Sequence, residues 1–104
     1  MNENAKIIIL RGNSGSGKTT VAKKLQKCLG GGTLVISQDV VRREMLMVKD
    51  GPENKAIFLL SEMVKFGKEN CKYVILEGIL NSNWYEELFK TVLAEYGFNN
   101  IYSL

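Results

Sequence analysis

Residues 12–19 read Gly12-Asn13-Ser14-Gly15-Ser16-Gly17-Lys18-Thr19 and match the pattern G-x-x-x-x-G-K-[ST]. The residues before them, 5–10, form an almost unbroken apolar run, which predicts a strand buried on both faces of a parallel sheet. The residues after them carry apolar side chains at spacings of three and four with lysines between, which predicts an amphipathic helix. Strand, glycine-rich loop and helix therefore follow one another in the order that a phosphate-binding loop requires.

The chemistry of such a loop explains each of its fixed positions. Backbone N–H groups can wrap a polyphosphate only where bulky Cβ atoms are absent and a helix N-terminus faces the charge. Lys18 supplies a cation for the β- and γ-phosphates, and the Thr19 hydroxyl is placed to ligate the Mg²⁺ that bridges them. We therefore expect ATP and Mg²⁺ to be bound by Gly12, Asn13, Ser14, Gly15, Ser16, Gly17, Lys18, Thr19 and, at the border with ordinary helix, Thr20.

Composition limits the other possibilities. The chain has 104 residues, 45% of them hydrophobic, and a formal charge of +3, so we expect one domain and find no support from charge for nucleic-acid binding. Cys28 lies on the apolar stripe of the first helix and Cys71 precedes an apolar run, without C-x-x-C spacing or any histidine, which predicts two buried, reduced thiols. No signal peptide or membrane-length apolar segment is present, so we expect a cytoplasmic protein without a membrane partner.

Predicted strands and helices alternate along the chain. The strands are expected at residues 6–11, 33–36, 73–76 and 100–104, and the further helices at residues 39–48, 53–70 and from Asn83 to Gly97. Pro52 fits the first position of the third helix, and Asn83 with Glu86 forms a capping-box pattern for the last one. Gly30-Gly31-Gly32 is interpreted as a helix C-cap and turn rather than a second phosphate loop. This alternation predicts a parallel α/β sheet.

Ligands of such sheets collect at the carboxyl ends of strands, where the second strand is followed by Ser37-Gln38-Asp39. Asp39 is open to two interpretations: an N-cap carboxylate, or the general base that accepts the proton of an attacking hydroxyl. Arg42, one turn further on, either holds an anionic part of an acceptor substrate or forms a solvated ion pair with Asp39 or Glu44. Arg43 is expected to point elsewhere, toward solvent.

Glu77 ends the third predicted strand, the apolar run 73–76. An apolar strand that delivers an acid is the pattern of the second nucleotide-binding motif, although that motif more often carries Asp. Glu77 is therefore a candidate for orienting Mg²⁺ or for touching the acceptor, and the alternative is an ordinary strand-end charge.

With the loop, residues 37–42 and residues 74–78 in place, the chain resembles the small P-loop kinases of the polynucleotide-kinase, chloramphenicol-phosphotransferase and zeta-toxin type. Bacterial proteins called uridine kinase-like are also similar. The resemblance implies a three-layer P-loop NTPase fold and ATP-dependent phosphorylation of a hydroxyl on a small molecule, nucleoside or polynucleotide end. In it, Asp39 matches the family's base and Arg42 its substrate-binding arginine.

The chain departs from this family at its end. Such kinases carry an arginine-rich lid after the fourth strand and then a fifth strand, whereas the arginines of this chain are Arg11, Arg42 and Arg43. We therefore expect residues 1–104 to be the amino-terminal core of a longer kinase domain, truncated after the fourth strand. Two alternatives stay open: a nucleotide-binding regulatory or interaction module without turnover, and a simple NTPase. The exposed fourth strand also predicts homodimerisation through residues 100–104.

Overall fold

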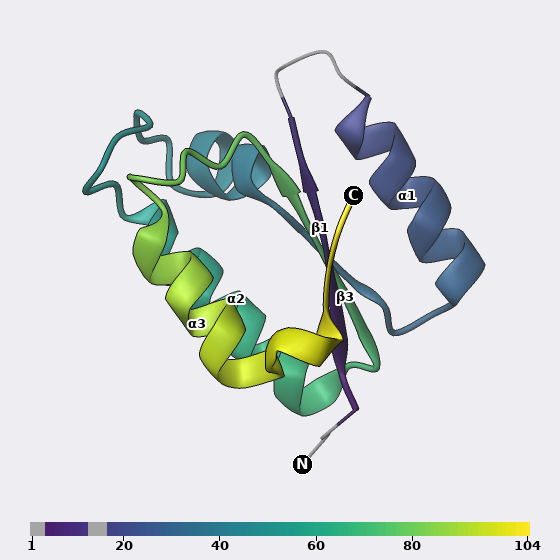
Figure 1. Cartoon of the computed structure of the whole chain (residues 1–104). Helices are drawn as coiled ribbons and strands as arrows, with labels where there is room; N and C mark the ends of the chain where they lie inside the picture. Colours follow the sequence, from purple (N-terminus) through teal and green to yellow (C-terminus); the bar gives the residue numbers. More distant parts are fainter. Residues whose placement is uncertain (1–3, 13–16) are drawn as a thin grey trace.

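Four parallel strands form the sheet at the centre of the molecule (Figure 1). The computed structural model describes residues 4–12 and 17–104. The strands are β1 (Lys6–Arg11), β2 (Leu34–Ser37), β3 (Tyr73–Gly78) and β4 (Ile101–Ser103), in the spatial order β2-β3-β1-β4. The predicted parallel α/β sheet is confirmed, and the two longest strands, β1 and β3, occupy its centre.

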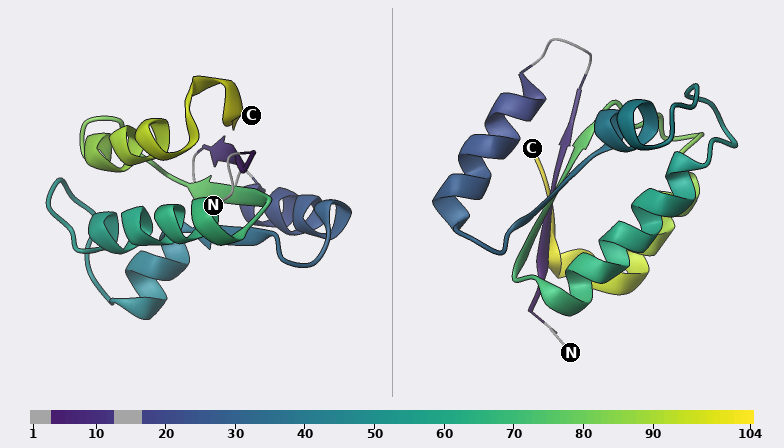
Figure 2. Two further views of the ribbon diagram at one scale, coloured as in Figure 1. Left: turned by 90° about the horizontal axis from the view of Figure 1, so that it is seen from below. Right: turned by 180° about the vertical axis from the view of Figure 1, so that it is seen from behind.

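Helices cover both faces of this sheet and give the three layers that the resemblance implies (Figure 2). Helix α1 (Lys18–Leu29) packs on one face, where Leu10, Ala22 and Ile75 are buried. Helices α2 (Ala56–Asn70) and α3 (Glu86–Tyr96) pack side by side on the other face, over the larger core. Alternate residues of β1 serve the two cores, because successive side chains of a strand point to opposite faces.

The strand register sets up the site. Leu10 of β1 and Ser37 of β2 both lie opposite Glu77 of β3, and Arg11 lies opposite Gly78. The carboxyl ends of β1, β2 and β3 therefore lie side by side at one end of the sheet, and a different loop follows each strand.

Two predicted helix starts are wrong, and the helix predicted at residues 39–48 has another hydrogen-bond pattern and an earlier end. Residues 40–45 form a π-helix, η1 (Val40–Met45), in which Leu46 N donates to Val41 O at 3.1 Å. Helix α2 begins after Asn54, whose side-chain oxygen accepts from Ala56 N at 2.8 Å, so Pro52 lies in the preceding turn. Before α3, the side chain of Asn81 accepts from the N–H groups of Asn83 and Trp84, which replaces the predicted capping box. In each case the backbone N–H groups bond to a nearby side-chain oxygen or within a wider turn, and not in the pattern that the sequence predicts.

The turns and cysteines give two confirmations and one correction. Gly30 caps α1 with φ +103° and donates to Gln26 O at 2.9 Å, as a helix-ending glycine should. Cys71 is buried as expected, but Cys28 is exposed. Within the described residues α1 is the only helix on its face of the sheet (Figure 2), so it buries a narrower stripe than its sequence pattern indicates. A short 3₁₀-helix, η2 (Phe98–Asn100), precedes β4.

Among the described helices, none combines the length and the apolar character that crossing a membrane demands.

Candidate functional site

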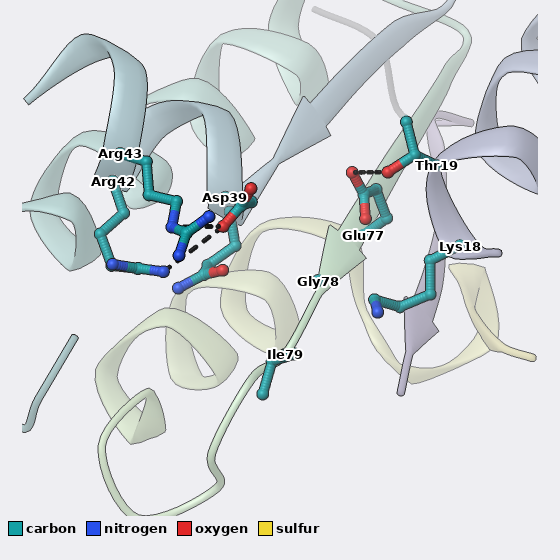
Figure 3. Close-up of a pocket in the computed structure, with 9 residues that line it drawn as sticks. Lys18, Thr19, Asp39, Arg42, Arg43, Glu77, Gly78 and Ile79 are labelled. Carbon is teal, nitrogen blue, oxygen red and sulfur yellow. Dashed lines mark hydrogen bonds and ion pairs between the residues drawn. The ribbon is translucent and has the colours of Figure 1, made fainter. Parts of the chain in front are cut away.

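A cavity of about 280 Å³ opens at the carboxyl ends of β2 and β3 (Figure 3). Its lining consists of Lys18, Thr19, Gln38, Asp39, Arg42, Arg43, Glu77, Gly78 and Ile79. The five side chains that sequence reasoning singled out for chemistry, Lys18, Thr19, Asp39, Arg42 and Glu77, thus share one cavity. Gly12, Gly17 and Thr20 are not part of its lining, and Asn13, Ser14, Gly15 and Ser16 lie outside the described residues.

The end of the glycine-rich loop delivers Lys18 and Thr19 to this cavity. Gly17 adopts φ +82°, the left-handed conformation that favours glycine, and its carbonyl accepts from Val21 N in the first turn of α1. Lys18 and Thr19 are the first two residues of the helix, where the backbone dipole favours bound anions. The first turn of α1 contains no acidic residue to compete for that position.

Thr19 and Glu77 form one side of the site (Figure 3). The Thr19 hydroxyl donates to Glu77 Oε2 at 3.3 Å, and the glutamate is only 2% exposed. Hydroxyl and carboxylate oxygens are the donors that Mg²⁺ prefers, and Mg²⁺ in nucleotide sites takes one or two carboxylates and completes its shell with phosphates and water. The pair therefore fits the metal that the sequence predicts.

Asp39 forms the other side together with two arginines from η1 (Figure 3). Its Oδ1 lies 3.4 Å from Arg42 Nη2 and 3.4 Å from Arg43 Nε, and its side chain is 56% exposed. The Asp39 side chain makes no cap hydrogen bond, because Ser37 Oγ accepts from Val40 N at 3.3 Å instead. The N-cap interpretation of Asp39 is therefore wrong, and so is the expectation that Arg43 points away from the site.

Sequence reasoning missed Gln38 and the contacts behind it. Gln38 is buried, and its amide nitrogen donates to Tyr85 Oη at 2.8 Å and to Asp50 Oδ2 at 3.2 Å. Burial and the adjacent Asp50 carboxylate raise the pKa of the Tyr85 hydroxyl above its ordinary value, so it stays protonated at neutral pH. Tyr85 lies on the apolar stripe of the helix predicted from Asn83, and nothing in that pattern distinguishes a hydroxyl that forms hydrogen bonds from a ring that only packs.

A second cavity, of about 430 Å³, adjoins the first and shares Thr19, Asp39 and Glu77 with it. Its other walls include Lys23 of α1 and Glu44 of η1. The three shared residues thus stand between two spaces, which is the arrangement that two ligands meeting at one reacting group would need.

Comparisons with known proteins agree with this fold. A family model described as an AAA domain matches residues 7–99. A "putative kinase" from Chloroflexus aurantiacus J-10-fl has a solved structure that superposes with a TM-score of 0.72 at 19% identity, covering 96% of this chain and 58% of that one. The structure of APE1195 superposes with a TM-score of 0.64 at 19% identity, covering 98% of this chain and 61% of that one.

The chain thus spans about three fifths of the length of these two structures. Among curated proteins, none matches it. The match over residues 7–99 takes in β2, β3, nearly all of β1, the three α-helices and the cavity. The expected resemblance to the small P-loop kinases is confirmed in the fold, and the chain belongs to the AAA domain family.

Proposed function

We propose that this chain is the core of an ATP-dependent phosphotransferase that moves a γ-phosphate to the hydroxyl of an acceptor. The observation that carries the proposal is the division of one cavity into two unlike sides. Lys18, Thr19 and Glu77 lie on one side and Asp39 with Arg42 and Arg43 on the other (Figure 3). Phosphoryl transfer needs such a division, because donor and acceptor approach the transferring phosphorus from opposite directions.

Each side has a role that its residue types can fill. Lys18 binds the β- and γ-phosphates of ATP, and Thr19 with Glu77 holds Mg²⁺, which neutralises charge that develops on the phosphates. Asp39 accepts the proton of the acceptor hydroxyl as its oxygen forms a bond to the γ-phosphorus and the bond to the leaving ADP oxygen breaks. Arg42 and Arg43 place cations where an anionic part of the acceptor would lie.

The exposed edge of the sheet supports the proposed homodimer. Among the described strands β4 pairs only with β1, and Tyr102 and Leu104 beside its free edge are exposed. A free, partly apolar edge can pair with another strand. Sedimentation of the chain checks this: a dimer that Tyr102→Lys dissociates is expected, and a strictly monomeric chain would contradict it. A cytoplasmic location is proposed on the sequence argument alone.

The function is tested by incubating the chain with Mg²⁺, ATP labelled in its γ-phosphate, and a panel of acceptors. The panel contains nucleosides, an oligonucleotide with a free 5′-hydroxyl, sugars and hydroxyl-bearing antibiotics. Calorimetric titration with a nonhydrolysable ATP analogue runs in parallel on the chain and on Lys18→Ala. We expect analogue binding that Lys18→Ala removes, and label on at least one acceptor.

The other outcomes separate the rival functions. Analogue binding without any labelled acceptor would favour a nucleotide-binding regulatory or interaction module. Phosphate release that does not depend on an acceptor would favour a simple NTPase. Equal analogue binding by the chain and by Lys18→Ala would overturn the phosphate site itself.

A further inference from the structure

Behind the cavity lies a polar cluster, with two buried and two half-buried members, that the transfer chemistry does not use directly. We call it the Tyr85 network, formed by Gln38, Asp50, Asn54 and Tyr85. The Tyr85 hydroxyl donates to Asp50 Oδ1 at 2.6 Å and accepts from Gln38 Nε2 at 2.8 Å and from Asn54 Nδ2 at 3.3 Å. Asn54 also donates to Asp50 Oδ1 at 3.0 Å. One hydroxyl thus joins the end of β2, the loop before α2 and the start of α3.

The Asp50 carboxylate is satisfied by several donors at once. Besides Tyr85 and Asn54, it accepts from Gly51 N at 3.0 Å and, through Oδ2, from Gln38 at 3.2 Å. A buried polar group that is fully hydrogen-bonded fixes its neighbours, whereas a half-satisfied one is costly. The Tyr85 network therefore has the character of a rigid support.

Arg42 links this support to the cavity. Its Nε lies 4.0 Å from Asp50 Oδ2 and is buried without a hydrogen-bond partner in the described part of the chain. Its Nη1 donates to Val48 O at 3.2 Å, and its Nη2 reaches Asp39 on the cavity side. The guanidinium group is thus held between the network and the candidate base.

Gln38 makes the second link. It lines the cavity, and Gly78 at the end of β3 approaches it so closely that a Cβ there would lie 2.6 Å from the Gln38 Cβ. With its amide nitrogen bound to Tyr85 and Asp50, Gln38 has one fixed orientation at the cavity wall.

We infer that Tyr85 and Asp50 are positioning residues that hold Arg42 and Gln38 in the orientation an acceptor meets. That an acceptor binds there rests on the proposed phosphotransferase function. The positioning of Arg42 and Gln38 does not depend on that function. Tyr85 acts through its hydroxyl, at a distance from the reacting atoms, and its ring packs in the core as any aromatic ring would.

The chain offers a matched control for this inference. Tyr96 is the last residue of α3, the helix that Tyr85 directly precedes. It is also buried, and it donates its hydroxyl to Val64 O at 2.9 Å, away from the cavity. Tyr85→Phe and Tyr96→Phe each remove one buried hydroxyl and leave a ring of the same size. Only the first removes a partner of Gln38 and Asp50.

The test follows the arginine Nε–Hε signals of the ¹⁵N-labelled chain by NMR. The chain has three arginines, so Arg11→Lys and Arg43→Lys assign the Arg42 signal by elimination. Tyr85→Phe removes one hydrogen bond from Asp50, which then holds the guanidinium group of Arg42 less firmly. We therefore expect it to shift the Arg42 signal and to speed the exchange of its Hε with water roughly 3- to 10-fold. Tyr96→Phe should leave the Arg42 signal unchanged, although it should lower the melting temperature of the chain by about as much as Tyr85→Phe does.

An Arg42 signal that is the same in the chain and in Tyr85→Phe would overturn the inference, as would an equal shift in Tyr96→Phe. If Tyr85→Phe does not fold, Asp50→Asn replaces it, because the amide keeps the shape of the carboxylate and removes its charge. An unmoved Arg42 signal in folded Asp50→Asn would overturn the inference in the same way.

A kinetic experiment distinguishes failure of the positioning inference from failure of the proposed phosphotransferase function. With an acceptor from the transfer assay, Tyr85→Phe should raise the KM for the acceptor about 3- to 10-fold and leave the KM for ATP unchanged. A fall in kcat with both KM values unchanged would contradict positioning. If the chain transfers no phosphate to any acceptor, the proposed function fails and the NMR result still decides the positioning of Arg42.

Discussion

Glu77 and Asp39 lie at the carboxyl ends of neighbouring strands and line the same cavity, yet their surroundings are opposite. Glu77 is 2% exposed and accepts a hydrogen bond from a neutral hydroxyl, whereas the Asp39 side chain is 56% exposed and lies against two arginines. A buried carboxylate favours a cation brought to it, because its charge is poorly solvated. An exposed carboxylate with cations beside it keeps an oxygen accessible to a second substrate. Position at the sheet edge alone does not assign a role; burial and partners do.

The strongest test of this contrast is Asp39→Asn. The amide keeps the shape of the side chain and cannot accept a proton, so we expect kcat for transfer to fall about 10²- to 10⁴-fold, roughly 3–5 kcal/mol. Affinity for the nonhydrolysable ATP analogue, measured by calorimetry, should stay within about threefold (roughly 0.65 kcal/mol) of the unsubstituted chain. Weaker binding of the analogue with an unchanged kcat would show that Asp39 belongs to the nucleotide side.

Gly78 joins the two sides, since it follows Glu77 and packs on Gln38. Its φ of +149° strains any other residue, and an added Cβ would lie 2.6 Å from the Gln38 Cβ. We expect Gly78→Ala to lower the free energy of unfolding by about 2–4 kcal/mol, from strain and overpacking together. Urea denaturation measures this.

Gly31→Ala is the matched control for Gly78→Ala. Gly31 lies in the exposed turn after α1, and a Cβ there would meet no atom within 4 Å. Its unfolding midpoint should stay close to that of the unsubstituted chain. Equal losses in the two variants would mean that the close approach of Gly78 to Gln38 does not exist in solution.

Glu77→Gln addresses the buried side alone. The amide can keep the hydrogen bond to Thr19 but is a poor ligand for Mg²⁺, so we expect affinity for the ATP analogue at low Mg²⁺ to fall about 10-fold, as for partners of metal ligands elsewhere. Calorimetry over a range of Mg²⁺ concentrations measures this effect. Glu44→Gln, an exposed carboxylate of the neighbouring cavity, is the control and should show no change. A loss that is equal with and without Mg²⁺ would exclude a role for Glu77 toward the metal.

The fold was largely predictable because its signals are local. An apolar run, a glycine-rich loop and a helix of period 3.6 each depend on neighbouring residues, and the strands lie within two residues of their predicted ends. The predicted helix boundaries are wrong where tertiary contacts or competing side chains determine the first residue of the helix. Asn54 begins α2 in place of Pro52, and Asn81 makes the turn that Asn83 was expected to cap.

The site divides in the same way. Lys18, Thr19, Asp39, Arg42 and Glu77 could be assembled from sequence because parallel strands end at a common edge. The Tyr85 network could not, since its Asp50 and Tyr85 are 35 residues apart and meet only through the packing of α3 against the loop before α2. Tyrosine on an apolar stripe predicts a core ring, and its hydroxyl partner is set by the tertiary structure.

The smallest expected effect compares the two arginines beside Asp39. Arg43 is 67% exposed and its ion pair lies in solvent, so Arg43→Gln should change the free energy of unfolding by less than about 1 kcal/mol. Arg42 is 16% exposed and also donates to Val48 O, so Arg42→Gln should cost about 1–3 kcal/mol, because the Val48 carbonyl and Asp50 lose a donor and a nearby cation. Urea denaturation at low and high salt measures both, and only the Arg43→Gln difference should vanish at high salt. Equal losses in the free energy of unfolding for the two variants would mean that the two arginines are equally ordered. Asp39 would then be less accessible to an acceptor than its exposed fraction indicates.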